Sequence, residues 1–158
     1  MPADRLTIST PGRVCLFGEH QDYLSLPVIP CAISLRIRLS GKRNDEGRVA
    51  LRLPDIGSEE SFALAEDGGY VRERDYYRSV HNVLRRHGCT FSGGFSGEVR
   101  STIPVNAGTS SSSALVVTWA HFLARMSDQG LAPTAEELAR WAYQAEVLEI
   151  GRASCRER

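Results

Sequence analysis

One stretch near the N-terminus alternates strictly between apolar and polar side chains. Ile33, Leu35, Ile37 and Leu39 are separated by single serine or arginine residues. A period of two predicts a β-strand with one buried and one solvated face, and another layer of the protein must cover the buried face. The alternation resumes at residues 49–53 after turn-forming residues 41–47, so we predict that the two segments form a β-hairpin.

Three later segments have the apolar period of helices, which can provide that cover. The first is 72–87, followed by Gly88. The second is 114–126, with a stripe of Leu115, Trp119, Phe122 and Met126. The third opens with a capping-box pattern at residues 134–137 and carries a stripe of Leu138, Trp141, Ala145 and Leu148. Residues 91–103 predict one more strand, broken by glycines. Strands mostly precede helices, which favours an α+β fold over a doubly wound α/β sheet.

The composition is that of an ordinary globular domain, with 42% hydrophobic and 24% charged residues. A net charge of zero gives no reason to expect nucleic acid or an anionic membrane as a partner. The N-terminus lacks the apolar core of a secretory signal, so we expect a cytoplasmic location. The cysteines form no CxxC pair, and we expect reduced, mostly buried thiols at Cys15, Cys31, Cys89 and Cys155.

A serine run, IPVNAGTSSSSALVV, occupies residues 103–117. Such composition is typical of a flexible linker, but this run passes without a break into a well-patterned helix. The other interpretation is an anion site. Gly108 permits close approach of the backbone, and the serines place hydroxyl and N–H groups at a helix N-terminus. The lysine of the common GxxxxGK[ST] phosphate loop is absent. Composition leaves both interpretations open.

A second cluster places Glu19, His20, Asp22 and Tyr23 within five residues, after an apolar stretch. Groups that both donate and accept hydrogen bonds suit a polyhydroxyl ligand, and a polar surface turn is the alternative. Metal binding by the three ionisable groups is disfavoured because neighbours on an extended strand point in opposite directions. Arg13 is either a solvated strand residue or a cation directed at phosphate.

The two stretches together, PGRVCLFGEHQDY and then PVNAGTSSSSA, resemble the GHMP kinase superfamily of galacto-, homoserine, mevalonate and phosphomevalonate kinases. The second stretch is similar to the family's phosphate motif, PxxxGLxSSA, and the GEHxDY form is most similar to galactokinases. The resemblance implies the family's N-terminal domain, an α+β fold with a mixed sheet and helices on one face, also found in ribosomal proteins. It implies ATP and Mg²⁺ as cofactors and phosphorylation of a small sugar, first of all galactose to galactose 1-phosphate.

The resemblance also implies a role for individual residues. Arg13 would be catalytic, near the transferred phosphate, and the sugar would be bound by Glu19, His20, Asp22 and Tyr23. Mg²⁺ would be bound by Ser112 and by Glu146, on the last helix. The ATP phosphates would be bound by Asn106, Ala107, Gly108, Thr109, Ser110, Ser111, Ser112 and Ser113.

The chain departs from the family pattern at several positions, which leaves the sugar open. Asn106 stands where glycine is common, Thr109 where leucine is usual and Gln21 where threonine is usual, and LSL at residues 24–26 replaces Asn-Gly-Gly. The alternatives are a kinase for another sugar or sugar acid, a mevalonate kinase, a non-catalytic sugar or nucleotide sensor on the same fold, and an unrelated α+β domain of the ribosomal type.

The end of the chain is expected to lie outside the domain. Residues 150–158, IGRASCRER, match the translation of a common sequencing adapter, so we expect a native domain over 1–149 and a non-native tail. The family's catalytic aspartate follows the glutamate matching Glu146 by about a dozen residues, and here the last aspartate is Asp128. We therefore expect the C-terminal GHMP domain to be missing and this piece to have little or no kinase activity.

Overall fold

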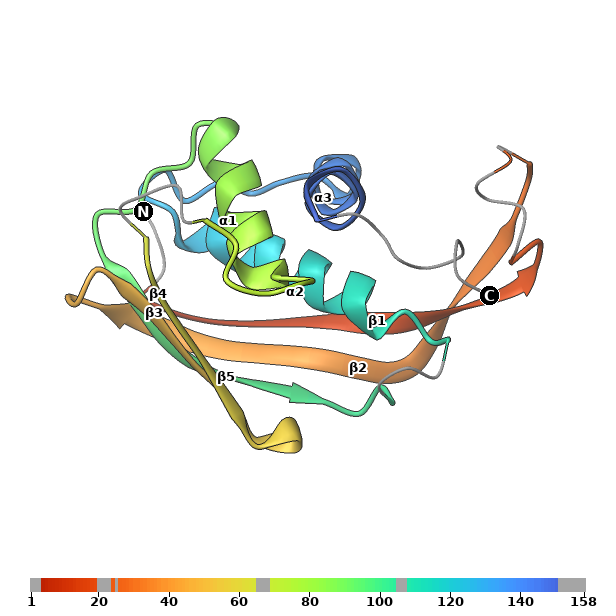
Figure 1. Cartoon of the computed structure of the whole chain (residues 1–158), viewed down its shortest axis with the longest axis horizontal. Helices are drawn as coiled ribbons and strands as arrows, with labels where there is room; N and C mark the ends of the chain where they lie inside the picture. The colour runs from red at the N-terminus through yellow and green to blue at the C-terminus, as the bar shows by residue number, and fades with distance from the viewer. Residues whose placement is uncertain (1–3, 20–23, 25, 65–68, 105–107, 151–158) are drawn as a thin grey trace.

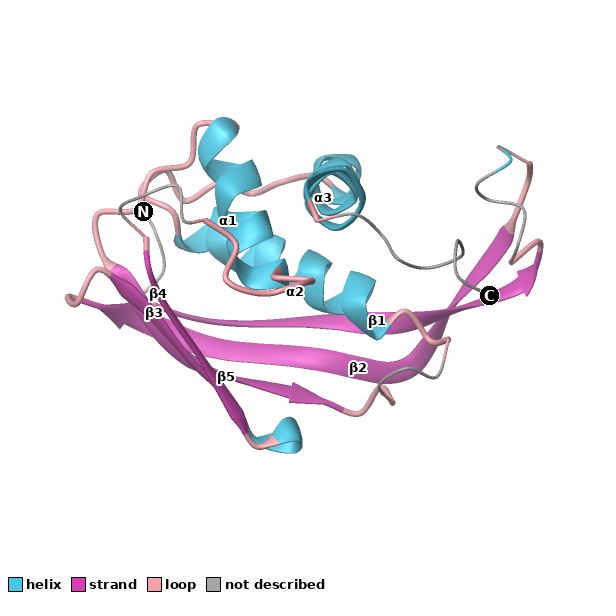
Figure 2. Cartoon of the chain, in the orientation of Figure 1, coloured by secondary structure: helices cyan, strands magenta, loops and turns pink. Residues whose placement is uncertain are grey.

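A computed structural model of the chain describes residues 4–19, 24, 26–64, 69–104 and 108–150. Within them, one mixed sheet carries a layer of helices on one face (Figures 1 and 2). In chain order the elements are β1 Arg5–Phe17, β2 Ile29–Asn44, β3 Arg48–Leu53, the 3-10 turn η2 Pro54–Ile56, β4 Ser58–Ala63, α1 Tyr76–Arg86, β5 Gly94–Ser101, α2 Ser111–Met126, α3 Ala135–Tyr143 and the π-helix η3 Gln144–Glu149. The predicted α+β class with helices on one face is confirmed.

The strands are arranged in the order β1-β2-β5-β3-β4, and β3 and β5 are the parallel pair among antiparallel neighbours. The predicted hairpin is therefore wrong: β2 and β3 are joined by a short turn but do not pair, because β5 lies between them. Gly94 begins β5 in this gap, where an added Cβ would lie 2.2 Å from the Arg48 carbonyl oxygen and 2.2 Å from Asn44 Oδ1. The amide of Asn44 donates to Ser96 Oγ at 2.7 Å and helps to hold the inserted strand.

The alternation in β2 does give the predicted two faces. Ile37 and Leu39 are buried and Ile33 and Leu35 are half-buried, while the serine and arginine residues that alternate with them are exposed. The centre of the covering layer is Trp119 of α2, which is fully buried and stacks on Phe122 with ring centroids 5.7 Å apart. Its indole N–H donates to the Tyr77 carbonyl oxygen at 3.0 Å. Burying a large apolar side chain contributes about 1.5–3 kcal/mol, and the hydrogen bond to Tyr77 joins α2 to α1 within the helix layer.

The helices differ from their predicted bounds at their ends. The first begins only at Tyr76, because the Asp75 side chain accepts the Arg78 N–H and caps the helix there. The second begins earlier than predicted, inside the serine run. The capping box at Thr134 is confirmed. The prediction that Leu148 belongs to the apolar stripe is wrong, since 64% of the residue is exposed. The wider turn of η3 rotates Leu148 out of register with the preceding α-helix.

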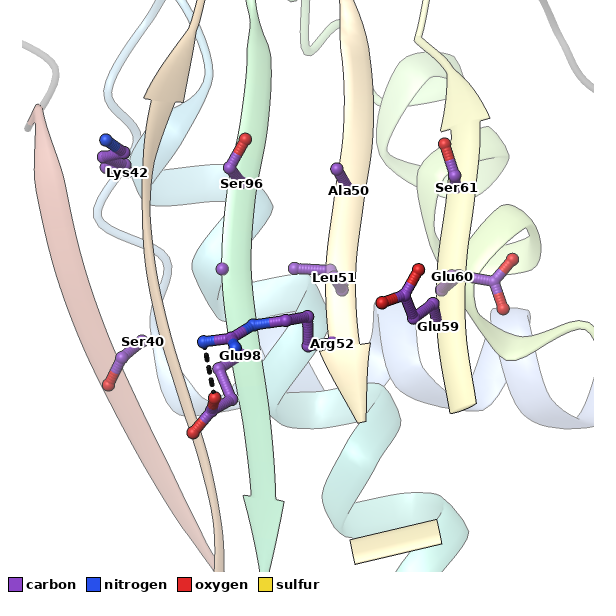
Figure 3. Close-up of a pocket in the computed structure, with 11 residues that line it drawn as sticks. Ser40, Lys42, Ala50, Leu51, Arg52, Glu59, Glu60, Ser61, Ser96 and Glu98 are labelled. Carbon is purple, nitrogen blue, oxygen red and sulfur yellow. Dashed lines mark ion pairs between the residues drawn. The ribbon is translucent and has the colours of Figure 1, made fainter. Parts of the chain in front are cut away.

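The other face of the sheet is open and polar (Figure 3). A hollow of about 570 Å³ lies on it, floored by short side chains such as Ser96, Ala50 and Ser61. Arg52 of β3 pairs with Glu98 of the neighbouring strand β5 at 2.8 Å. The residues that line the hollow come from β2, β3, β4 and β5. Among the described residues, none of those predicted to bind ligand lines it.

The cysteines are less buried than predicted. Cys89 is buried, but Cys15 is half-buried and Cys31 is exposed, and all three are free thiols. Cys155 lies outside the described residues. No helix in the described part of the chain is long and apolar enough to cross a membrane.

Candidate active site

The end of β1 and the start of α2 bring the two sequence motifs together. The backbone N–H of Arg13 donates to the Thr109 carbonyl oxygen at 3.1 Å. Gly12 is buried beside the same oxygen, which would lie 3.1 Å from an added Cβ. At Gly108, the residue before Thr109, an added Cβ would lie 4.0 Å from Glu19 Oε1. A residue of the predicted sugar cluster therefore lies beside the predicted phosphate loop.

The serine run forms the N-terminus of α2. Gly108 and Ser110 both adopt left-handed backbone, with φ of +69° and +55°, and Ser110 is the N-cap, whose carbonyl oxygen accepts from Ala114. Residues 111–113 form the first helical turn, so the linker interpretation is wrong for them. The first N–H groups of a helix have no intrahelical acceptor, and they are suited to an anion. Binding of phosphate by these residues stays a prediction.

Glu146 lies against this turn. The Ser112 hydroxyl donates to Glu146 Oε1 at 2.7 Å, and the Ser113 hydroxyl donates to Oε2 at 2.8 Å. Only 7% of Glu146 is exposed. A buried carboxylate is costly unless it accepts hydrogen bonds, and here both of its oxygens do.

The π-helix η3 presents Glu146 to α2. It is held at one end by Ser79 of α1, whose buried hydroxyl donates to the Ala145 carbonyl oxygen at 2.5 Å. At the other end, Arg86 and the Tyr70 hydroxyl bind the two oxygens of Glu149. Burial and the hydrogen bond to Glu149 raise the pKa of Tyr70. π-Turns within helices are frequent at functional sites, and this one places a carboxylate at the candidate site.

Arg13 is half-buried in β1. Within the described part of the chain its guanidinium has no carboxylate partner. A half-buried guanidinium without a carboxylate partner among the described residues is suited to an anionic ligand, and a catalytic role for Arg13 stays a prediction.

Ser112 and Glu146 are the described groups that fit Mg²⁺. They offer a hydroxyl and a carboxylate oxygen, and Mg²⁺ prefers oxygen ligands. No cluster of three or more His, Cys, Asp or Glu side chains suited to a metal occurs among the described residues. Mg²⁺ that binds together with a nucleotide takes one or two carboxylates, substrate phosphates and water as ligands, and binding of Mg²⁺ by Ser112 and Glu146 stays a prediction.

Comparison with known proteins gives the family. The model of the GHMP kinases N-terminal domain matches residues 75–155, half of the chain. The chain belongs to the GHMP kinase family. A galactokinase galactose-binding signature also matches residues 2–43 of this GHMP domain.

Curated relatives include both galactokinases and mevalonate kinases. The galactokinase of Pasteurella multocida is 30% identical, over 92% of this chain and 38% of its own length. The mevalonate kinase of Thermococcus sibiricus is 31% identical, over 95% of this chain and 47% of its own length. The chain therefore spans less than half the length of these relatives.

Solved structures agree on the fold. Lactococcus lactis galactokinase complexed with galactose gives a TM-score of 0.82 at 25% identity, over 95% of this chain and 39% of that one. Methanococcus jannaschii mevalonate kinase gives 0.78 at 24% identity, over 90% of this chain and 46% of that one.

The two motifs are only partly covered by the described residues. His20, Asp22, Tyr23, Asn106 and Ala107 lie outside the described residues, and Glu19 is exposed at the end of the described part of its motif. The residues that the sequence reasoning missed are those supporting η3, namely Ser79, Tyr70, Arg86 and Glu149. The pattern of α1 does not mark Ser79, because Arg78, His81 and Asn82 beside it are polar as well.

Proposed function

We propose that residues 1–149 are the ATP- and sugar-binding part of a galactokinase-like enzyme. The reaction would move the γ-phosphoryl group of ATP to a hydroxyl of galactose. One observation carries the proposal: the N-terminal motif, which lies within the galactose-binding signature at residues 2–43, meets the serine loop through the Arg13–Thr109 hydrogen bond and the approach of Glu19 to Gly108. Donor and acceptor sites must be adjacent for direct transfer between them.

Each group near this junction has a role in the proposed reaction. Phosphoryl transfer depends on positioning and on stabilising charge at the phosphate oxygens. The N–H groups of the first turn of α2 and the Arg13 guanidinium would provide positive charge for these oxygens. Ser112 and Glu146 would hold Mg²⁺, which neutralises phosphate charge when bound. Glu19 would accept a hydrogen bond from a sugar hydroxyl, together with His20, Asp22 and Tyr23.

Calorimetric titration tests the substrate. The 158-residue chain is titrated with D-galactose, D-glucose and mevalonate, each with and without Mg-ATP. We expect galactose to bind most tightly and Glu19→Gln to weaken galactose binding about tenfold while leaving ATP binding unchanged, since a charged hydrogen bond contributes about 1.5–3 kcal/mol. Failure of all three ligands to bind would contradict the proposal.

A mevalonate kinase is the second candidate, favoured by the 31% identity to the Thermococcus sibiricus enzyme over 95% of this chain. Tighter binding of mevalonate than of galactose in the same titration would support it.

Catalysis by the chain alone is a separate question. The expectation of little or no turnover by these 158 residues stays a prediction, as does a non-native tail at 150–158. A coupled ADP-release assay with galactose and Mg-ATP tests the first, and robust turnover would refute it. A sensor built on the same fold would bind ligands without turnover even in a longer protein.

A further inference from the structure

We propose that Ser113 is a positioning residue for Glu146 and not a ligand of phosphate. Through Glu146 it would set the affinity of the site for Mg²⁺ bound with ATP, so the inference rests on the proposed function. The family motif PxxxGLxSSA ends in alanine at the position of Ser113, so the hydroxyl here is additional to the motif.

The hydrogen bonds of Ser112 and Ser113 determine which further ligands each hydroxyl can bind. Each hydroxyl has a single proton to donate, and Ser113 gives its proton to Glu146 Oε2 at 2.8 Å. A phosphate oxygen only accepts hydrogen bonds, so Ser113 has no proton left for one. Ser112 likewise gives its proton to Oε1, but a cation requires only the lone pairs of the hydroxyl oxygen. Ser112 can therefore bind Glu146 and Mg²⁺ at once, whereas Ser113 is occupied.

The helix geometry explains why one carboxylate meets both hydroxyls. Successive residues of an α-helix are separated by about 100° around the axis, so the two hydroxyls leave α2 in different directions. A group bonded to both must lie between them, and η3 holds Glu146 there. With one oxygen on each serine, the carboxylate is fixed in both position and plane.

Loss of the Ser113 hydroxyl would remove this constraint. Oε2 would be buried without a donor, and a buried acceptor without a partner is costly. The carboxylate would then rotate about the remaining bond to Ser112, away from the orientation that it offers to a metal ion. The expected defect lies in metal affinity, not in contact with ATP itself.

ATP titrations with and without Mg²⁺ separate these effects. The variants are Ser113→Ala, Ser113→Thr, which keeps a hydroxyl, and the control Ser58→Ala, an exposed serine of β4. We expect Ser113→Ala to weaken ATP binding about fivefold to tenfold in Mg²⁺ and less than twofold in EDTA. Ser113→Thr should restore most of the loss, and Ser58→Ala should match the wild type. Equal weakening in Mg²⁺ and EDTA would make Ser113 a phosphate ligand and overturn the proposal.

The same titrations distinguish failure of the positioning role of Ser113 from failure of the proposed function. If the wild-type chain binds ATP and Ser113→Ala behaves like it, the positioning role fails and the proposed function stands. If the wild-type chain binds no ATP, the proposed function fails and the positioning role fails with it.

A measurement without nucleotide tests the pairing itself. Thermal unfolding is compared for the wild type, Ser113→Ala, Glu146→Gln and the double variant. Coupled residues give non-additive effects, so the double variant should lose less in Tm than the sum of the two single losses. Additive losses would overturn the pairing whatever the ATP titrations give.

Discussion

Two residues of the serine loop occupy left-handed backbone, but they differ in what it costs them. Gly108 adopts φ of +69° freely, whereas Ser110 adopts +55° with a Cβ that disfavours it. Left-handed backbone costs a non-glycine residue about 1–2 kcal/mol, and such strain is concentrated at functional sites. The Ser110 side chain makes no capping hydrogen bond to offset the cost. The loop is therefore held by its surroundings, in particular by the bond from Arg13 to Thr109.

Gly108→Ala tests the importance of this backbone. We expect the free energy of unfolding to fall by about 1–2 kcal/mol, because alanine is strained at positive φ, and ATP affinity to fall at least tenfold. The matched control is Gly88→Ala, at φ of +88° after α1 with no atom within 4 Å of the added Cβ. It should lose similar stability and keep its ATP affinity. Equal ATP affinity in the two variants would show that the loop does not contact ATP.

At the scale of elements, the C-terminal end of α2 is fixed to the start of β5 by Asp128. One carboxylate oxygen accepts from the N–H and hydroxyl of Ser92 at 3.0 and 2.7 Å, and the other accepts from Thr90 Oγ1 at 2.9 Å. Burial alone would raise the pKa of Asp128, but these hydrogen bonds and the charge of Arg43 outweigh it and lower the pKa. The ionised carboxylate therefore stabilises the fold.

This contribution should depend on pH in a defined direction. Because the pKa of Asp128 is lower in the folded than in the unfolded chain, the stabilisation is complete above the ordinary value of 3.8 and is lost as pH falls through the folded value. We expect Asp128→Asn to lower the free energy of unfolding by about 1–3 kcal/mol at pH 7. In urea unfolding, the difference in unfolding free energy between Asp128→Asn and the wild type should shrink as the pH falls below 3.8. A difference that stays constant would contradict the assignment.

The capping box of α3 provides a purely local test. Thr134 Oγ1 accepts from the Glu137 N–H, and Glu137 accepts from the Thr134 N–H at 2.7 Å. We expect Thr134→Ala to cost about 0.5–2 kcal/mol of unfolding free energy. The control Glu136→Gln, which removes an exposed pair with Arg140, should cost less than about 0.5 kcal/mol. Equal losses would contradict the cap.

The sequence predicted the local elements well and the non-local ones poorly. The cap at Thr134, the faces of β2 and the helical character of α2 follow from neighbouring residues. The separation of β2 from β3 does not, because it depends on a strand about forty residues away in sequence. Within the site, the resemblance to GHMP kinases predicted roles for Ser112 and Glu146. The inward turn of Glu146 depends on η3 and on Ser79, which no spacing rule indicates.

At the scale of the whole molecule, one end is unusually apolar. The tips of β1 and β2 extend beyond the helix layer at the right of Figure 1. Phe17 pairs directly with Ile29 there, and these residues are 71% and 55% exposed. Leu16, Leu24, Leu26 and Val28 are also exposed nearby in sequence. Apolar patches of this kind are sites of association or aggregation.

Replacing Phe17 and Ile29 should reduce self-association of the chain without changing its free energy of unfolding. We expect Phe17→Ser with Ile29→Thr to reduce self-association in sedimentation velocity at high concentration. The free energy of unfolding should change by less than about 0.5 kcal/mol, as for most surface substitutions. The control is Ile56→Thr, which changes an equally exposed isoleucine outside this end. An equal reduction in the control would assign association to general hydrophobicity.

The position of β5 also determines when the sheet can be completed. The pairs β1–β2 and β3–β4 join segments close in sequence, but the centre requires β5, which ends at Ser101. Contacts between distant segments carry the largest closure entropy and slow folding. During synthesis, β2 and β3 each keep an unpaired edge until Ser101 has left the ribosome. The nascent chain is therefore most exposed to wrong strand pairing after β1 to β4 have been made and before β5, the last of the described strands, has followed.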